Sequence, residues 1–352
     1  MDAAALDFLR KILETPSPSG YEWPVQEVVR QYVAGFADEV STDLHGNVIA
    51  SKNPHAPLRL MFAGHADQIG LVVQYIDAEG FVYLQPIGGW DTQVLVGQPL
   101  SVWSAGGMVQ GVMARKPIHL LSEEERKQVP KFKDLWLDIG AKNKEEADKM
   151  IRVGDPVTLT LGLKQLPNNL AYATGMDDKC GLWVAVEALR RAGKKKLSCA
   201  IFAVSTVQEE IGLRRAKTSS FSIDPRVGVA IDVTHATDCP TMDKKQEGDV
   251  RLGGGPVIYR GPNMNPAVVQ RLIGAADRAG IAYQLAASGK PTGTDANMMQ
   301  VSRGGMATGL VSIANRYMHS PCEMISLDDI DKAADLLAAF AEELTEDVNF
   351  TP

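Results

Sequence analysis

Four short runs of almost uninterrupted apolar residues constrain the fold of this 352-residue chain more than any other feature. The runs are Leu58–Ala63, Cys199–Val207, Val227–Val233 and Met306–Ala314. Strands that are buried on both faces of a parallel sheet have this pattern, whereas strands with one solvated face alternate apolar and polar residues. Because segments with helical periodicity separate the runs, the sequence predicts an α/β fold with a mostly parallel sheet sandwiched by helices.

Capping residues mark the expected helices. These cover residues 4–14, 24–36, 178–192 and 265–279, and a last helix begins at Ser326. Asn265 followed by Pro266 is typical of a helix start, and Gly280 is typical of a helix end. The sequence SLDD at Ser326 is close to a capping-box pattern.

Residues 69–164 follow a different pattern. They contain short alternating segments separated by glycine turns, which is typical of antiparallel strands. The charged stretch 122–134 within them is expected to be a solvated loop or helix. We therefore expect an α/β domain formed by residues 1–68 and 165–352, and a β-rich domain, residues 69–164, inserted into it.

Composition excludes several classes of protein. The net charge is −7 and the longest basic run is Lys194–Lys196, so nucleic acid and anionic membranes are not expected partners. No stretch approaches the roughly 18 apolar residues of a membrane span, and the first residues lack the pattern of a secretory signal. The four cysteines form neither a CxxC pair nor a dense disulfide pattern. These features predict a soluble, reduced, cytoplasmic protein.

Acidic and imidazole side chains follow the apolar runs. They are His65 and Asp67, Glu209 and Glu210, Asp232, and His319, joined by the pair Asp177–Asp178 at the start of a predicted helix. Because ligands bind where the carboxyl ends of parallel strands meet, we expect these groups to lie together. Each feature alone is more often surface chemistry or a helix cap, but five of them at corresponding positions favour a site.

The donor types indicate a metal site. Unpaired buried charge is unfavourable, and a bound cation would compensate it. Oxygen and imidazole donors without thiolate suit Zn, Co or Mn. Two imidazoles and three carboxylates are enough for two divalent ions that share one carboxylate, an arrangement that activates a shared water for hydrolysis. One glutamate must then stay off the ions to take the proton from that water.

Six motifs in order resemble the M42 family of metallo-aminopeptidases. They are GHADQIG (64–70), MDDKCG (176–181), VQEEIGLRRA (207–216), AIDVTHATD (230–238), GTDA (293–296) and RYMHSP (316–321). The family includes the self-compartmentalised TET peptidases and glutamyl aminopeptidases, and its members have often been labelled endoglucanases. The resemblance spans most of the chain.

The resemblance implies a role for each of seven residues. His65 and Asp232 would hold one ion, Glu210 and His319 the other, and Asp177 would bridge the two. Glu209 would be the general base, and Asp67 would orient His65 through its other ring nitrogen.

The resemblance also extends beyond the catalytic residues. It implies a cis peptide between Asp177 and Asp178. The inserted domain would be a dimerisation module, and dimers would assemble into a twelve-subunit shell, although a simple dimer stays possible on the sequence alone.

Three residues need separate comment. Gln68 stands where the family often has Glu, and Arg215 where it commonly has Gly. Either change could alter substrate preference without touching a proposed ligand. His235, three residues after Asp232, is the nearest competitor for a ligand role.

The leading functional hypothesis is a two-metal aminopeptidase that acts on short peptides, with a water shared by the ions as the nucleophile and Glu209 as the base. The main alternative is a metal-dependent deacylase or carboxypeptidase that uses the same metal chemistry. An endoglucanase is less favoured. Two carboxylates suffice for that reaction, so it would not need the two histidines at strand ends. Aromatic residues, which stack against sugars, are only 6% of the chain. A non-catalytic binding protein would be expected to lack one of these groups.

Overall fold

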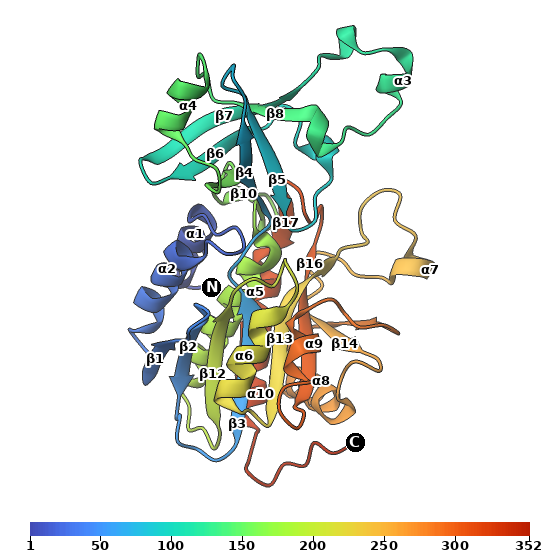
Figure 1. The fold of residues 1–352 in the computed structure, drawn as a ribbon. Coiled ribbons are helices and arrows are strands. Elements are labelled where there is room, and N and C mark those ends of the chain that lie inside the picture. Colours follow the sequence, from blue (N-terminus) through green and yellow to red (C-terminus); the bar gives the residue numbers. More distant parts are fainter.

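An eight-stranded sheet forms the centre of the larger domain. A computed structural model describes residues 1–352 (Figure 1). The strand order is β1-β2-β12-β3-β13-β16-β14-β15. The strands are β1 (Glu39–Thr42), β2 (Val48–Lys52), β12 (Ala200–Thr206), β3 (Arg59–His65), β13 (Val227–His235), β16 (Ala307–Asn315), β14 (Val257–Arg260) and β15 (Gln284–Ala287).

The four predicted apolar runs are the four central strands. β12, β3, β13 and β16 pair in parallel, whereas β2 and β14 join them antiparallel. The central strands are buried along most of their length, which explains why their residues do not alternate. The predicted α/β fold is therefore confirmed.

Helices cover both faces of this sheet. α1 (Ala3–Glu14), α5 (Met176–Ala192), α8 (Pro266–Ala279) and α10 (Leu327–Glu342) form one layer, and α2 (Trp23–Val33) packs beside α1. α6 (Arg214–Ile223) and the short α9 (Asp295–Met299) pack together on the other face (Figure 1). α7 (Lys244–Glu247) lies on a loop that extends away from the sheet.

A closed six-stranded barrel stands at one end of the sheet (Figure 1). Its strands are β4 (Gly70–Ile76), β5 (Val82–Ile87), β8 (Leu135–Asp138), β7 (Gly107–Arg115), β6 (Pro99–Ser104) and β9 (Pro156–Leu159). Its 16 buried apolar residues form a core of their own, separate from the core of the sheet and its helices. The barrel is thus a β-rich domain distinct from the α/β domain.

Short elements complete the barrel domain. α4 (Lys144–Met150) packs against the barrel, and an arm between β7 and β8 carries η2 (Ile118–Leu120), α3 (Glu123–Arg126) and η3 (Phe132–Asp134). η1 (Thr92–Val94) follows β5. The charged stretch 122–134 lies on this arm, where α3 is exposed as expected.

A three-stranded sheet connects the barrel to the α/β domain. Its order is β10 (Lys164–Leu166), β11 (Leu170–Ala173) and β17 (Glu323–Ser326). β11 leads directly into α5, and β17 leads directly into α10. This small sheet therefore holds the starts of two helices beside the carboxyl ends of the central strands.

The end of α2 and the cap of α10 differ from the sequence prediction. α2 ends at Val33 rather than residue 36, since residues 34–36 form a turn. Ser326 precedes α10 but its side chain makes no capping bond. The acid three positions on, Asp329, instead accepts the N–H groups of Gly253 and Gly255. No helix combines the length and apolarity needed to span a membrane.

Candidate active site

The carboxyl edge of the central sheet brings the predicted residues together. His65 ends β3 and pairs in register with Thr206 of β12, after which the chain runs into Glu209 and Glu210. Asp232 lies on β13, and the loop after β16 carries His319. Parallel pairing therefore aligns these strand ends at one place, as expected for an open α/β sheet.

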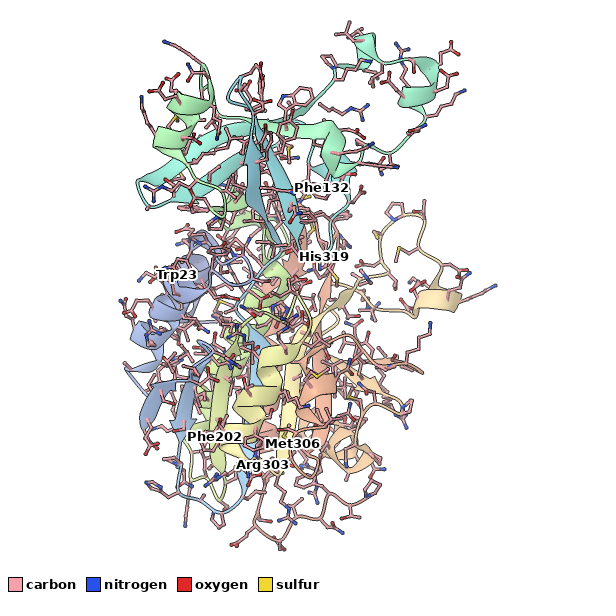
Figure 2. The ribbon with its side chains drawn as sticks, in the orientation of Figure 1. Trp23, Phe132, Phe202, Arg303, Met306 and His319 are labelled. Carbon is pink, nitrogen blue, oxygen red and sulfur yellow. The ribbon has the colours of Figure 1, made fainter.

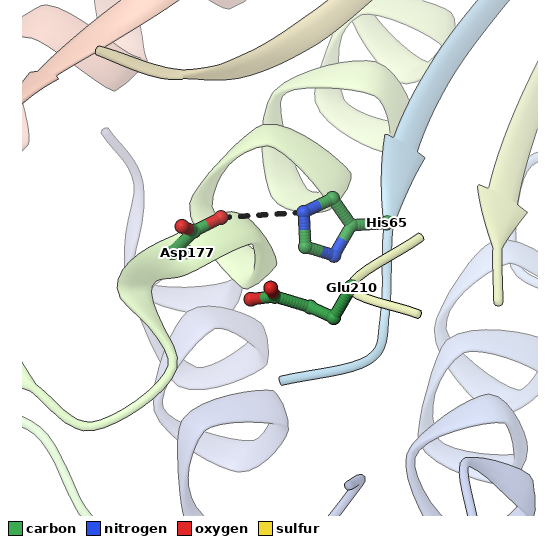
Figure 3. Close-up of side chains that lie close together, drawn as sticks. All are labelled: His65, Asp177 and Glu210. Carbon is green, nitrogen blue, oxygen red and sulfur yellow. Dashed lines mark ion pairs between the residues drawn. The ribbon is translucent and has the colours of Figure 1, made fainter. Parts of the chain in front are cut away.

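Asp177 lies between the two histidines. Its Oδ1 is 3.2 Å from Nε2 of His65, and its Oδ2 is 3.2 Å from Nε2 of His319 (Figure 3 shows the His65 side). Glu210 Oε2 lies 3.5 Å from the same nitrogen of His319. A carboxylate that presents one oxygen to each of two imidazoles has the arrangement needed to bridge two cations.

Two groups of side chains can each offer three converging ligand atoms to a cation. One is His65, Asp177 and Glu210, and the other is His65, Asp178 and Asp232. Glu210 Oε1 is buried and has no hydrogen-bond partner. A buried carboxylate oxygen without a donor is rare, and a cation would supply its missing partner. The residues present therefore fit divalent metal ions.

Asp178 differs from Asp177 in its existing partners. Its carboxylate accepts the N–H groups of His65 at 3.2 Å and of Gly181 at 3.1 Å. The peptide bond between Asp177 and Asp178 is cis, which confirms what the family resemblance implied. Asp177 thus turns its carboxylate toward the histidines while Asp178 binds main-chain groups.

Crowded acids shift one another's pKa values. Burial, and then the charge of neighbouring acids, raises the pKa of Glu209 and of Glu210 well above the usual range. Burial and Asp177 raise the pKa of Asp232 to about 8, although His65 opposes the shift. These shifts arise because several acids crowd into a desolvated place, where a divalent cation would favour their charged forms.

For His319 and the bridging carboxylate of Asp177, the pKa shifts favour the charged form instead. A hydrogen bond to Asp177 raises the pKa of His319 to about 9, against the effect of burial. Burial alone would raise the pKa of Asp177, but the bonds from His319 and His65 lower it. His319 and Asp177 therefore favour each other's charged forms, an effect that a cation beside Asp177 would also have on the carboxylate.

Asp67 contacts the other ring nitrogen of His65, mainly through its main chain. Nδ1 of His65 contacts the main-chain carbonyl of Asp67 at 3.0 Å, whereas the Asp67 carboxylate is 3.5 Å away. That carboxylate accepts the N–H groups of Glu209 at 3.0 Å and Glu210 at 3.1 Å, and a 2.6 Å bond from Ser19. Its side chain therefore fixes the loop that carries the two glutamates, while its main chain orients His65.

Two further side chains hold the same loop and were not found from the sequence. Asn47 Oδ1 accepts the N–H of Val207 at 3.1 Å, and Glu22 Oε1 accepts that of Gln208 at 3.1 Å. Glu22 Oε1 also accepts the N–H of Gly20 at 2.8 Å. Neither residue has a sequence signal beyond its position after a turn, because the contacts join segments about 160 to 190 positions apart.

Glu323 is a second buried acid that the sequence analysis did not single out, although it follows the RYMHSP motif closely. Its carboxylate accepts main-chain N–H groups of Asp177 and His319. Asp295, in the GTDA motif, accepts a bond from Thr206. Asp295 is a further buried acid near the site.

The barrel domain contributes main chain to the site. A Cβ atom on Gly89 would lie 3.4 Å from Nδ1 of His319, and one on Gly88 would lie 3.4 Å from Oε2 of Glu210. Figure 2 shows His319 at the junction of the barrel and the large sheet. The loop after β5 thus passes directly over the cluster, and glycine allows this close approach.

A cavity of about 490 Å³ opens onto the cluster. Its wall includes Asp177, Glu209, Glu210, Asp232 and His319, together with exposed residues such as Lys290. His235 also lines this cavity, but, unlike His319, it forms no ion pair with Asp177 or Glu210. His235 therefore lies on the cavity wall, apart from the histidines that contact Asp177.

The two departures from the family pattern lie outside the cavity wall. Gln68 is buried and accepts a 2.6 Å bond from Lys179. Arg215 Nε donates to the side chain of Gln208 at 3.0 Å, and its Nη1 donates to His45 O at 2.8 Å. Both residues therefore support the loops around the site, and neither contacts the space where a substrate would bind.

Comparisons with known proteins agree with this architecture. The model of the M42 glutamyl aminopeptidase family matches residues 46–336. A lysyl aminopeptidase of Pyrococcus furiosus is 38% identical over 98% of this chain and 99% of its own length. The crystal structure of a TET aminopeptidase from a marine sediment Thaumarchaeota archaeon has a TM-score of 0.93 at 32% identity, with 97% of each chain covered.

A further structural match concerns assembly. The TET1 peptidase of Pyrococcus horikoshii, described as able to assemble into a tetrahedron or a large octahedral shell, has a TM-score of 0.86 at 30% identity. The match covers 97% of this chain and all of the other.

Proposed function

Since the chain belongs to the M42 family of aminopeptidases and is therefore a peptide-bond hydrolase, we propose that it removes N-terminal residues from short peptides with two divalent ions. The observation that carries this proposal is the placement of Asp177, which presents one carboxylate oxygen to His65 and the other to His319.

Five side chains would hold the ions. Asp177 would bridge them, with His65 and Asp232 on one side and Glu210 and His319 on the other. Zn, Co or Mn suits these oxygen and imidazole donors. When bound, such a pair polarises a carbonyl and lowers the pKa of a water between the ions.

Glu209 is the proposed general base. Its carboxylate lines the cavity, and Oε2 lies 3.8 Å from Nε2 of His65. Burial raises its pKa well above the usual range, which makes it a better proton acceptor at neutral pH. Glu209 would take the proton of the attacking water and deliver it to the amine that leaves.

Two other hydrolytic functions have less support. A metal-dependent deacylase would use the same ligands but would not require a free α-amine on its substrate. A glycosidase would need rings for sugar stacking, and Tyr259 is the only Phe, Tyr or Trp that lines the cavity. The family matches favour the aminopeptidase.

The test compares free and blocked substrates. Aminoacyl-p-nitroanilides with a range of side chains, acidic and basic ones included, are offered with the α-amine either free or acetylated. We expect hydrolysis of the free amines only, and its loss with a chelator. Equal hydrolysis of acetylated substrates would replace the aminopeptidase with the deacylase.

We also propose that the chain forms a homo-oligomer through its barrel domain, either a dimer or a larger shell. Its arm exposes Ile118, Leu120 and Val129, with 63%, 67% and 55% of each residue accessible. Clustered exposed apolar residues are typical of interaction surfaces. The ability of the Pyrococcus horikoshii TET1 peptidase to assemble into shells supports a homo-oligomer as such.

A further inference from the structure

We propose that Glu323 is a positioning residue of the ion site, which fixes the separation of Asp177 and His319 by binding the main chain of both. This inference rests on the proposed function, since it assumes that these two residues hold the ions. It adds a residue that contacts neither the ions nor the substrate.

The geometry of Glu323 is specific to these two partners. Its Oε1 accepts the N–H of His319 at 2.9 Å, and its Oε2 accepts the N–H of Asp177 at 3.1 Å. The side chain is buried. One rigid carboxylate therefore joins the bridging residue and a terminal ligand, which come from segments more than 140 positions apart.

Glu323 itself is held in place. It is the first residue of β17 and pairs with Ala173 of β11, the strand that leads into α5. The small sheet therefore fixes the Glu323 main chain relative to the segment that carries Asp177. Because its main chain is fixed, the Glu323 side chain can in turn hold the main chain of both Asp177 and His319 in place.

Both partners need such support. Asp177 has non-helical torsion angles, φ −78° and ψ 105°, within the first turn of α5. His319 has φ +58°, a left-handed conformation that residues other than glycine adopt infrequently. Without Glu323, one buried and one partly buried N–H group would lose their acceptors where the main chain is irregular.

A carboxylate is required because each oxygen serves a different donor. A glutamine in this place has one oxygen that accepts and one amide nitrogen that only donates. Glu323→Gln would therefore keep one bond and place a donor against the other N–H group. Loss of a residue that orients a metal ligand typically lowers metal affinity by about 10- to 100-fold.

Asp329 provides a matched control elsewhere in the chain. It is also buried, and its two carboxylate oxygens accept the N–H groups of Gly255 and Gly253, both at 2.8 Å. None of these three residues lines the cavity. Asp329→Asn therefore makes the same chemical change, in the same kind of contact, away from the ions.

The experiment measures Zn²⁺ binding to full-length, chelator-stripped protein by competition with a chromophoric chelator, and thermal unfolding without metal. The wild type should bind about two ions per chain, as a paired-metal site requires. Glu323→Gln should bind at least one of them about tenfold or more weakly. Asp329→Asn should lower the unfolding temperature yet bind both ions as the wild type does.

The other outcomes overturn the inference in distinguishable ways. Wild-type affinity in Glu323→Gln, or an equal loss in Asp329→Asn, would leave Glu323 with only a structural role while the proposed function stands. A wild type that binds no ion would overturn the proposed function as well. If Glu323→Gln does not fold, Glu323→Asp, whose oxygens are withdrawn by one methylene, is measured by the same criteria.

Discussion

At the scale of single residues, most of the acids around the site are of two kinds. Asp177, Glu209 and Glu210 direct carboxylate oxygens into the cavity. Glu22, Asp67 and Glu323 instead accept main-chain N–H groups, and so fix the segments that carry the acids of the first kind. The N–H groups belong to Gly20, Gln208, Glu209, Glu210, Asp177 and His319. The chemistry of the site therefore depends on acids that never reach the substrate.

Replacing Glu209 with Gln tests the proposed base. The amide cannot accept the proton of the attacking water, so we expect kcat to fall by at least about 100-fold, while metal content and thermal stability stay near those of the wild type. Metal analysis and p-nitroanilide kinetics measure both. Glu145→Gln, at an exposed position on α4, serves as the control, and substantial residual turnover in Glu209→Gln would exclude Glu209 as the base.

Replacing Glu22 with Gln tests the effect of a buried charge on stability. Burial, together with the charge of Asp67, raises the pKa of Glu22 from 4.5 to about 7. Its contribution to stability is therefore complete below pH 4.5 and is lost as the pH rises toward 7. Glutamine keeps the acceptor oxygen but has no proton to lose.

The free energy of unfolding of Glu22→Gln, relative to the wild type, should therefore rise with pH by up to about 3 kcal/mol and then level off. Urea unfolding of the metal-free proteins, from about pH 4.5 to about pH 8, measures this difference. A difference that does not change with pH would contradict the account.

At the scale of elements, the sequence predicts the central strands well because each is buried on both faces. It also predicts the helix from Asn265 to Gly280, since the Asn265 side chain caps it and Gly280 ends it in a left-handed conformation. The closure of the barrel could not be predicted, because it depends on pairings such as β4 with β9 between distant segments.

The same reasoning applies to the site. Strand ends indicated where the acids and histidines would meet, and the structure does bring them together. The supporting acids Glu22 and Glu323 could not be recognised, since neither belongs to a periodic pattern or a motif with a characteristic spacing. The sequence also could not predict that the main-chain carbonyl of Asp67 would bind His65 while its carboxylate binds the main chain of the two glutamates.

The packing of β3 against α5 provides a test at this scale. A Cβ atom on Gly64 would overlap the main chain of Gly181 and Leu182. Gly64→Ala should therefore displace α5, which carries Asp177, and lower stability by about 1–3 kcal/mol or more. We also expect weaker metal binding.

Gly304→Ala is the control, since nothing lies within 4 Å of a Cβ atom at that position. Calorimetry and metal titration compare the two variants. Wild-type metal affinity in Gly64→Ala would show that the site tolerates movement of α5.

At the scale of the whole molecule, the barrel and the α/β domain have separate cores but share the site. The barrel supplies the Gly88–Gly89 loop over Glu210 and His319, while its arm extends in another direction (Figure 1). The barrel domain can therefore cover the active site with its loop and associate with another chain through its arm.

The arm is tested by replacing Ile118 and Leu120 together with Glu. If the arm lies in an interface, buried charge should disfavour association, and light scattering should show a smaller species than the wild type. Val301→Glu changes a similarly exposed apolar residue of the α/β domain and should leave the assembly intact. An unchanged mass for the double variant would place the interface elsewhere.

The most direct test of the central claim is a metal titration followed by activity. Chelator-stripped protein receives Zn²⁺, Co²⁺ or Mn²⁺ in steps, and hydrolysis of its best aminoacyl-p-nitroanilide is measured at each step. We expect no activity without metal and a rise that ends at about two ions per chain, the number that a paired-metal site requires. Full activity in the stripped protein, or saturation at a single ion, would contradict the two-ion account.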